Sequence, residues 1–473
     1  MFFHSWLFAC FFLVFYPVYW FSRRSTRRDI WLFLCSYIFY GAGSYFISAG
    51  DFRQRSTWTA LLVALIFYST LVDYYCVRRM ARTSRRRRWL AVSLVNNLGM
   101  LGLFKYAAFV VHNTNSILGL FHFGFELTAP SLILPIGISF YTFQSMSYTI
   151  DFYRGQVDEE PDFIRFAAFV SLFPQLVAGP IERASELLPQ LRREPTVTWD
   201  DIAWGGSLFL VGLFKKVALA NYFASYADRI YNNPSAYESP ALIMATIAFA
   251  WQIYFDFSGY TDMARGVGRA MGIRLMLNFR HPYLATGLSD FWSRWHISLS
   301  TWFRDYVYIP LGGNRHGPWM LYRNLFLTMV ISGIWHGANW TYVIWGILHG
   351  GGACLLRSLE HSTWYRQKFP TLLKQLMVFA FVCFAWIFFR AADVADALTV
   401  VRGICRGGWQ DPRFPLLGWA LLAAVWSYEW LCESRYRTIV AAGWFNLLLA
   451  AGMILYLIVM PGGGDQAFIY FQF

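Results

Sequence analysis

Charge is scarce in this chain, and its scarcity excludes an ordinary soluble protein. Only 14% of the 473 residues are Asp, Glu, Lys or Arg, whereas soluble domains carry about 25% charged residues. Hydrophobic residues make up 57% of the chain and aromatic residues 20%. The composition therefore predicts a polytopic integral membrane protein, whose length cannot be converted into a domain count.

Acidic residues are the scarcer charge, with 27 Asp and Glu against 40 Lys and Arg. The basic runs lie between apolar segments, which disfavours a nucleic-acid partner and favours a role in membrane topology. The basic loops 23–28 and 78–88 are expected on the cytoplasmic side, with the N-terminus outside. The apolar run 5–22 is followed directly by Arg23 and Arg24 without a small-residue cleavage site, so we expect a first membrane span and not a cleaved signal peptide.

Motifs for metal binding and for a serine nucleophile are missing. The seven cysteines form no CxxC pair, and the chain holds neither an HExxH motif nor a GxSxG elbow. Five of the nine histidines have the character of end-of-span or loop residues: His4, His112, His122, His349 and His361. The remaining four are His281, His296, His316 and His336. Their spacings match no zinc motif, so the sequence predicts no metal site and no bound cofactor.

Apolar runs along the chain predict an all-α fold of about 11 to 13 transmembrane or re-entrant helices, with further helices in the membrane interface. No internal repeat divides residues 1–473, so we expect a single integral membrane domain. The expected spans are about 5–22, 30–48, 57–77, 89–111, 131–150, 163–180, 205–227, 241–258, 325–340, 341–356, 373–390, 415–432 and 444–460.

Proline and glycine interrupt two of these apolar stretches, 130–153 and 172–183. A broken helix at membrane depth must satisfy its freed backbone groups inside protein, so both stretches are expected to be buried and re-entrant. The polar stretch 183–204 that follows has the composition of a loop. The aromatic tail 465–473 could pack back into the protein.

Residues 282–323 form neither a span nor an ordinary loop. Aromatic and aliphatic residues recur at helical spacing from Phe291 to Val307, with Arg294, His296 and Arg304 between them. This pattern predicts one amphipathic, basic helix in the membrane interface. We expect the helix to begin at Ser289–Asp290 and to end at Pro310, on the cytoplasmic side.

Two acids, Asp256 and Asp262, lie at the polar end of an apolar span. Paired carboxylates could serve catalysis or bind a metal. Arg265, Arg269 and Arg274 follow closely in the chain, and ion pairs with these residues are the preferred interpretation.

The stretch 324–350 holds the most unusual residue. No Asp, Glu, Lys or Arg occurs within 325–348, yet His336 lies in its middle. A titratable side chain at membrane depth is costly, so it is a functional candidate. Trp335 precedes it, and on a helix Ser332 and Asn339 would share its face.

These segments resemble the signature blocks of the membrane-bound O-acyltransferases, in particular the bacterial branch that acetylates alginate. The FWSRWHISLSTWFRDYVYIPLGGNR block is long enough to be specific. The first 130 residues match only in general character. The matching blocks are 143–155, 173–183, 252–266, 291–315, 332–346 and 468–473.

The resemblance implies a funnel-like helical fold, with 1–130 as peripheral spans, 131–360 as the catalytic core and 361–473 as C-terminal spans. It implies that His336 is the active-site histidine and His296 the second family histidine. It further implies acyl transfer from a cytoplasmic thioester, acetyl-CoA, toward an acceptor outside the bacterial inner membrane. The acceptor would be a polysaccharide hydroxyl or a partner SGNH-like acetyltransferase.

Acyl transfer to a hydroxyl needs a base for the incoming O–H and donors for the developing oxyanion. A buried neutral His336 can accept the proton, and Ser332 or Asn339 could orient it or donate. Gly333 and Gly337 leave room for a neighbouring helix or an acyl chain. No enzyme nucleophile is evident, which favours direct transfer over an acyl-enzyme.

Arginines near His296 suit the phosphates of coenzyme A, because guanidinium groups bind phosphate in a bidentate manner. The candidates are Arg294, Arg304 and Arg315, and lipid headgroups are the alternative ligand. Two other functions stay open: a D-alanyl transferase that uses a carrier-protein thioester, and a transporter or flippase without chemistry. The sequence does not identify the final polymer.

Overall fold

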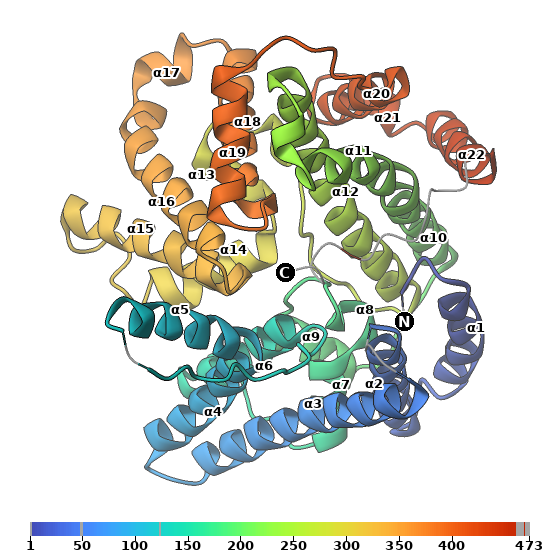
Figure 1. Ribbon diagram of the computed structural model, residues 1–473. Coiled ribbons are helices and arrows are strands. Elements are labelled where there is room, and N and C mark those ends of the chain that lie inside the picture. Colours follow the sequence, from blue (N-terminus) through green and yellow to red (C-terminus); the bar gives the residue numbers. More distant parts are fainter. Residues whose placement is uncertain (1, 48–50, 123, 460–467, 469–473) are drawn as a thin grey trace. The chain divides into compact units, whose positions relative to one another are not determined.

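The protein is built from helices. The computed structural model describes residues 2–47, 51–122, 124–459 and 468, and Figure 1 follows the chain through them. These residues form helices and connecting loops, and no β-strand occurs among them. The all-α prediction is therefore confirmed.

Contacts within the chain cluster into two compact units. Unit 1 comprises Met1–Phe209 and Met263–Met276, and unit 2 comprises Leu210–Asp262 and Leu277–Phe473. Helices α10 (Trp199–Phe214) and α12 (Ser239–Ala270) contribute residues to both units.

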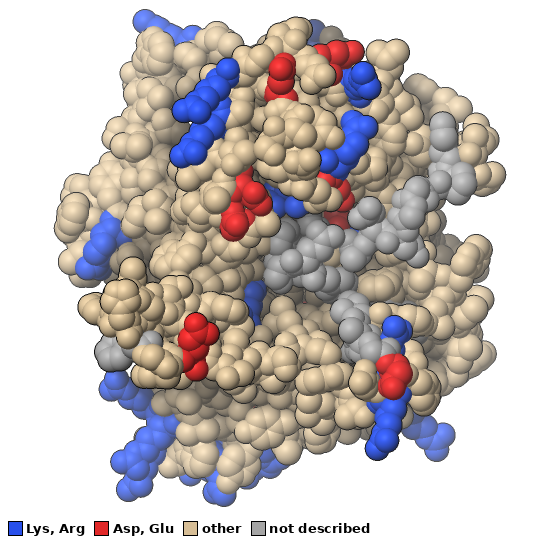
Figure 2. All heavy atoms as spheres, in the orientation of Figure 1, with Lys and Arg blue, Asp and Glu red and all other residues tan. Residues whose placement is uncertain are grey.

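Membrane-spanning helices account for the low charge of the chain. Among the described residues, five helical stretches are long and apolar enough to cross a bilayer: Phe52–Ala81, Arg86–Leu120, Trp199–Tyr231, Ser239–Ala270 and Thr371–Arg390. Apolar side chains such as Leu61, Val95 and Leu376 are exposed on them. Charged side chains are sparse on the face shown in Figure 2. The chain is therefore an integral, multi-pass membrane protein.

Unit 1 has a buried polar centre where three of its helices meet. Asp73 is fully buried and accepts hydrogen bonds from Ser93, Asn97 and Ser145. A buried carboxylate is tolerated only when its oxygens are hydrogen-bonded, so these donors fix the packing of α3, α4 and α6. The helices of unit 1 are α1 (Trp6–Phe21), α2 (Arg27–Ile47), α3 (Phe52–Ala81), α4 (Arg86–Leu101), η1 (Gly102–Tyr106), α5 (Ala107–Leu120), α6 (Ile138–Tyr153), α7 (Phe163–Ser171), α8 (Phe173–Leu176) and α9 (Ala184–Arg192).

An ion network joins four segments of unit 1. Arg165 on α7 lies 2.9 Å from Asp29 on α2 and 3.3 Å from Glu160 in the preceding loop. Arg192 at the end of α9 lies 2.8 Å from the second oxygen of Glu160. Both acids are buried, so each needs its guanidinium partners, and the network holds these segments together.

Of the two stretches rich in proline and glycine, 172–183 is buried as expected, whereas 130–153 is exposed at its start and largely buried only from Pro135 to Phe152. Residues 130–137 are not helical, and Gly137 takes a left-handed conformation (φ 66°) immediately before α6. In the second stretch only the short α8 is helical. The prediction of a loop over 183–204 was wrong. Its polar residues form α9 and the start of α10, because Glu, Gln, Arg and Leu are good helix formers.

Unit 2 has an aromatic core. The rings of Trp251, Tyr254, Tyr283, Trp295 and Trp386 are buried, and neighbouring rings contact one another at centroid distances of 5.1–6.2 Å. Large flat side chains bury much area per residue and stabilise the crossing of helices. Its helices are η2 (Lys215–Ala220), α11 (Asn221–Tyr231), η3 (Pro234–Ala236), η4 (Pro282–Leu284), α13 (Leu288–Arg294), α14 (Ile297–Phe303), η5 (Arg304–Tyr308), α15 (Gly317–His336), α16 (Trp340–His361), α17 (Thr363–Gln367), α18 (Thr371–Arg390), α19 (Val394–Arg406), α20 (Leu416–Glu433), α21 (Arg437–Val440) and α22 (Gly443–Val459).

The tail 465–473 lies outside the described residues, with the exception of Phe468. Phe468 is buried. Its ring centroid lies 5.4 Å from that of Tyr260 and 6.0 Å from that of Phe257, both on α12. This one residue of the tail therefore packs on the core of unit 2.

Glycines allow α15 and α16 to approach closely. A Cβ atom on Gly333 would collide with the carbonyl oxygen of Tyr342 and lie 3.1 Å from Gly346. A Cβ on Gly337 would overlap the Tyr342 ring. The expected room for a neighbouring helix at Gly333 and Gly337 is therefore occupied by α16.

The prediction of a single interfacial helix over 289–309 was wrong. The chain forms α13, then breaks at Trp295 and His296, and continues as α14 and η5. His296 has φ 44° and ψ 55°, the left-handed conformation, which interrupts a right-handed helix. Aromatic spacing does not reveal such a break, because the spacing continues across it.

Candidate active site

His336 is the last residue of α15. The helix ends there because Gly337 is extended (φ −167°), which turns the chain toward α16. The imidazole is only 5% exposed. Three rings surround it with centroids at 5.0–5.2 Å: Trp335, Trp345 and Phe389. His336 is therefore held in a nearly dry aromatic cage at a helix end.

The two polar residues expected beside His336 have different positions. Ser332 lies one turn earlier on α15, is buried, and lines a cavity of about 300 Å³. Asn339 does not share the face of His336, because α15 ends before it. Asn339 is instead the N-cap of α16: its side-chain oxygen accepts from the Thr341 N–H (3.1 Å), and its amide donates to the Ala392 carbonyl (2.8 Å). The prediction of a shared helix face is thus corrected.

His296 is completely buried between α13 and α14. Its Nδ1 lies 3.1 Å from Oδ1 of Asn278. The same oxygen accepts the backbone N–H and the hydroxyl of Ser298 (3.2 and 2.9 Å). Because a backbone N–H can only donate, the Asn278 amide oxygen must face it. Nδ1 of His296 is then the protonated nitrogen, and Nε2 carries the lone pair.

Aromatic rings connect the surroundings of the two histidines. Trp295, the residue before His296, contacts Trp386 at 5.2 Å, and Trp386 contacts Phe389 at 5.0 Å. Phe389 in turn contacts His336 at 5.2 Å. Both histidines therefore belong to one continuous aromatic core of unit 2.

Asp256 lies on α12, next to Phe257, whose ring contacts His296 at 4.6 Å. Asp256 and Lys216 form a buried ion pair of 2.7 Å. Asp262 pairs with Lys215, also at 2.7 Å. Both acids thus have lysine partners in η2, which lies about 40 residues earlier in the chain and which the sequence did not indicate.

The three arginines predicted to bind the donor differ in their surroundings. Arg294 is held between Asp290 (2.6 Å) and Glu433. Arg304 pairs with its neighbour Asp305 at 2.7 Å and is largely exposed. Arg315 is exposed in the loop before α15. Arg294 is therefore already neutralised by two carboxylates.

His349 was missed by the sequence analysis, which assigned it to the end of a span. It lies inside α16 and is fully buried. Its ring lies 4.7 Å from Trp345 and 5.0 Å from Trp292, and neither of its nitrogens has a hydrogen-bond partner among the described residues. The signal in the sequence is the spacing of four residues between Trp345 and His349, which places both on one helix face.

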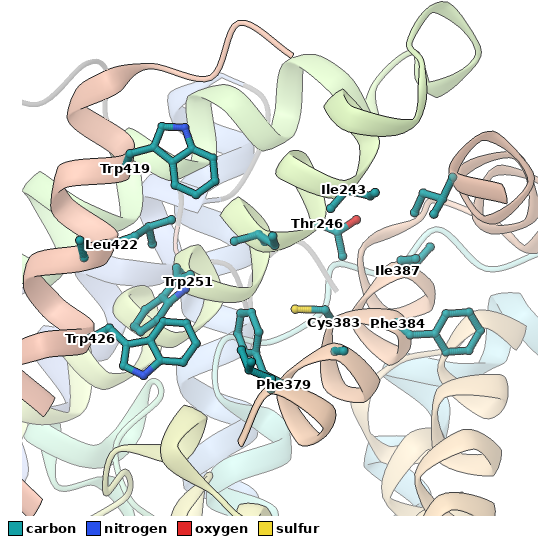
Figure 3. A pocket seen from close by; sticks show the side chains of 15 residues that line it. Ile243, Thr246, Trp251, Phe379, Cys383, Phe384, Ile387, Trp419, Leu422 and Trp426 are labelled. Atoms are coloured by element: carbon teal, nitrogen blue, oxygen red, sulfur yellow. The ribbon is translucent and has the colours of Figure 1, made fainter. Parts of the chain in front are cut away.

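A large apolar cavity of about 760 Å³ opens in unit 2. Figure 3 shows Trp251, Phe379 and Trp426 gathered at one side of it, with the Cys383 sulfur directed inward. The hydroxyl of Thr246 donates to the Leu242 carbonyl, so it is already engaged. The cavity is therefore lined mainly by apolar side chains and offers few groups that could take part in catalysis. Elsewhere in the described chain, no three His, Cys, Asp or Glu residues lie close enough together to hold a metal ion.

The class of protein to which these helices and buried histidines belong is given by a family match. A model of the MBOAT, membrane-bound O-acyltransferase, family matches residues 15–395, most of the chain. The chain belongs to this family and is an O-acyltransferase.

Three relatives show which members of the family the chain is similar to. The chain is 41% identical to the "Probable alginate O-acetylase AlgI" of Pseudomonas aeruginosa over 85% of this chain and 75% of the relative. It is 36% identical to the peptidoglycan O-acetyltransferase of Helicobacter pylori over 81% of this chain and 75% of the relative. It is 29% identical to the teichoic acid D-alanyltransferase of Bacillus subtilis over 55% of this chain and 69% of the relative.

Proposed function

We propose that the protein transfers an acetyl group from a cytoplasmic thioester, acetyl-CoA, for the O-acetylation of a polysaccharide outside the bacterial inner membrane. The similarity to an alginate O-acetylase and to a peptidoglycan O-acetyltransferase supports acetyl as the group and a glycan as the final acceptor. A partner SGNH-like acetyltransferase would pass the group to the polymer, with alginate as one candidate. The observation that carries the proposal is His336, buried in its aromatic cage within the region that matches the family.

His336 is assigned the role of general base. A neutral imidazole accepts the proton of the acceptor hydroxyl while the oxygen forms a bond to the acetyl carbonyl carbon. The C–S bond then breaks, and the proton passes to the departing thiolate, which leaves as free coenzyme A. Positioned general bases accelerate such steps by about 10² to 10⁴-fold. No covalent enzyme intermediate is needed.

His296 is proposed as a second station on the acyl-transfer route. Its fixed tautomer places the lone pair on Nε2, the nitrogen that can accept a proton or a hydrogen bond. Ser332 and Trp335 lie one turn before and directly before His336, and they are proposed to support it. Asp256 acts only indirectly, since it is bound to Lys216.

The D-alanyl alternative rests on a weaker similarity, 29% identity over 55% of the chain. It differs in its donor, a carrier-protein thioester. Binding of acetyl-CoA by the purified protein, set against binding of a charged carrier protein, separates the two. A transporter without chemistry would move a donor but leave its thioester intact.

The substitution His336→Ala tests the proposal. We expect purified full-length protein in liposomes to lose acetyl transfer from radiolabelled acetyl-CoA by about 10² to 10⁴-fold. His112→Ala is the matched control, because His112 is exposed on α5 and should be replaceable without loss. Transfer at the wild-type rate by His336→Ala would remove His336 from the mechanism.

A further inference from the structure

A polar cavity of about 860 Å³ lies within unit 1, separate from the histidine site described above. Its walls come from the loop before α9, from α9 itself, from the segment between α9 and α10 with the first turn of α10, and from the end of α12 with the loop after it. Ligand pockets measure about 300–1,000 Å³, so the volume is that of a binding site. The charged residues of the lining are Glu182, Arg183, Glu186, Arg193, Asp201, Arg269 and Arg274.

Hydrogen bonds clamp the walls of this cavity together. Glu182 is buried, and its side chain accepts from the backbone N–H of Met276 (2.7 Å). The amide of Gln190 accepts from the N–H of Arg274 (2.8 Å) and donates to the carbonyl of the same residue (3.1 Å). The backbone of Arg274 is thereby fixed, with its exposed side chain at the rim.

Most of the acidic groups in the lining are engaged. Asp201 pairs with Arg269 at 2.6 Å and also accepts the N–H and the hydroxyl of Thr198 (3.0 and 2.8 Å). Glu186 remains exposed at the rim. Arg193 and Arg274 are exposed as well, and their side chains form no ion pair in the part of the chain that the structure describes. The rim therefore offers two available guanidinium groups against one carboxylate.

Contacts inside unit 1 indicate on which side of the membrane the cavity opens. Glu194, next to Arg193, pairs with Arg24 at 2.9 Å. Arg28 donates to the carbonyl of Arg193 at 2.5 Å. Both arginines belong to the basic segment 23–28, which the positive-inside rule assigns to the cytoplasm. The cavity therefore opens on the cytoplasmic side.

We propose that this cavity is a binding site for a phosphate-bearing ligand from the cytoplasmic side, with Arg193 and Arg274 as its principal contacts. Two guanidinium groups that line one cavity and form no ion pair with any described residue suit phosphate oxygens better than Arg294, which two carboxylates already bind. The phosphates come either from a nucleotide-type thioester donor or from the headgroup of an anionic lipid. The first source rests on the proposed function.

Charge reversal of the two rim residues tests the site. Arg193→Glu and Arg274→Glu should each weaken binding of coenzyme A to the purified full-length protein by tenfold or more, as measured by calorimetry. Arg274→Lys should retain most of the affinity because it keeps the positive charge. Arg87→Glu is the matched control: it reverses an exposed arginine of another basic segment, and we expect an effect below twofold.

A second arm separates the two sources of phosphate. The same variants are compared in nanodiscs of phosphatidylcholine with and without phosphatidylglycerol, with the unfolding temperature as the readout. Loss of the stabilisation by phosphatidylglycerol, with unchanged affinity for coenzyme A, supports the site and assigns it to a lipid. Both Glu variants keep the hydrogen bonds of Glu182 and Gln190 that hold the cavity walls together. If both variants bind coenzyme A and respond to phosphatidylglycerol as the wild type does, the proposal is overturned.

The site and the proposed function can fail separately. Binding of coenzyme A is measured without transfer, so a His336→Ala protein should still bind it with wild-type affinity. A wild-type protein that binds coenzyme A through Arg193 and Arg274 but transfers no acetyl group would refute only the acetyl transfer.

Discussion

Asn278 shows how one side chain can set the chemistry of another. Its amide oxygen receives three donors: the backbone and hydroxyl of Ser298 and the Nδ1–H of His296. The ring of His296 is thereby oriented, and its tautomer is selected. A partner that fixes a functional imidazole in this way contributes to function without touching the substrate.

Replacement of Asn278 should therefore impair the enzyme through His296. We expect Asn278→Ala to lower the acetyl-transfer rate by about tenfold or more, because a misplacement of about 1 Å can cost up to about 100-fold. Asn278→Asp keeps an acceptor at the same point and should retain more activity. The unfolding temperatures of the two variants are measured as well, so that a lower rate is not mistaken for loss of folded protein. Equal transfer rates for Asn278→Ala and Asn278→Asp would argue against the orienting role.

At this scale the sequence identified the titratable residues but not their partners. His336 and His296 stood out because a histidine in an apolar or aromatic segment is unusual. Asn278 lies 18 residues from His296 and shares no periodicity with it. Lys216 lies 40 residues before Asp256, while three arginines lie nearer in the chain. Partners of this kind are set by the fold and not by local spacing.

The contact between α15 and α16 is the element on which His336 depends. We expect Gly333→Ala to lower the unfolding temperature and the transfer rate, because the added methyl group collides with the carbonyl oxygen of Tyr342 on α16. Overpacking of this kind costs about 1–3 kcal/mol. Gly351→Ala on α16 is the matched control: its Cβ meets nothing within 4 Å, and it should be neutral or stabilising. Equal behaviour of the two variants would contradict the close approach.

The buried pair of Lys216 and Asp256 joins η2 to α12 within unit 2. Removal of one partner strands a buried charge, so Asp256→Leu and Lys216→Met should each destabilise the protein by about 3–5 kcal/mol. The double variant carries no stranded charge and should recover most of this loss. A double-mutant cycle on the unfolding temperature measures the coupling. Additive losses would mean that the two charges do not depend on one another.

Elements with strong apolar periodicity were predicted well, and those defined by a backbone break were not. The expected spans 57–77, 205–227, 241–258 and 373–390 fall within helices of the structure. The break at His296 escaped prediction because it needs a left-handed residue stabilised by Asn278, a contact outside the local pattern. α9 escaped because its many polar residues hid a buried face, although Leu187, Leu188 and Leu191 recur at helical spacing.

At the scale of the whole molecule, buried ionisable groups make stability depend on pH, and Glu182 is such a group outside the membrane-spanning helices. Burial raises the pKa of this carboxyl to about 7 from its usual 4.5, opposed by the Met276 N–H. An acid with a raised folded-state pKa contributes stability below pH 4.5 and loses it as pH rises through 7. The total change is at most about 3 kcal/mol.

Glu182→Gln should remove this pH dependence while keeping the acceptor for Met276. Between pH 5 and pH 8 the unfolding temperature of the wild type should fall more than that of the variant. At pH 8 the variant should be the more stable protein. A parallel pH profile for both would show that Glu182 is ionised at the same pH in the folded and unfolded chains.

The left-handed conformation of His296 has a consequence for the mutational tolerance of that position. Most side chains adopt this conformation only at a cost of about 1–2 kcal/mol, whereas Gly, and occasionally Asn or Asp, enter it readily. An Ala scan would therefore remove an imidazole and strain a turn at once, and a loss of activity would have two causes. Asn is the informative replacement at 296, because it relieves the strain and deletes only the ring. Two constraints therefore limit which residues position 296 can accept: the need for an imidazole and the left-handed backbone conformation.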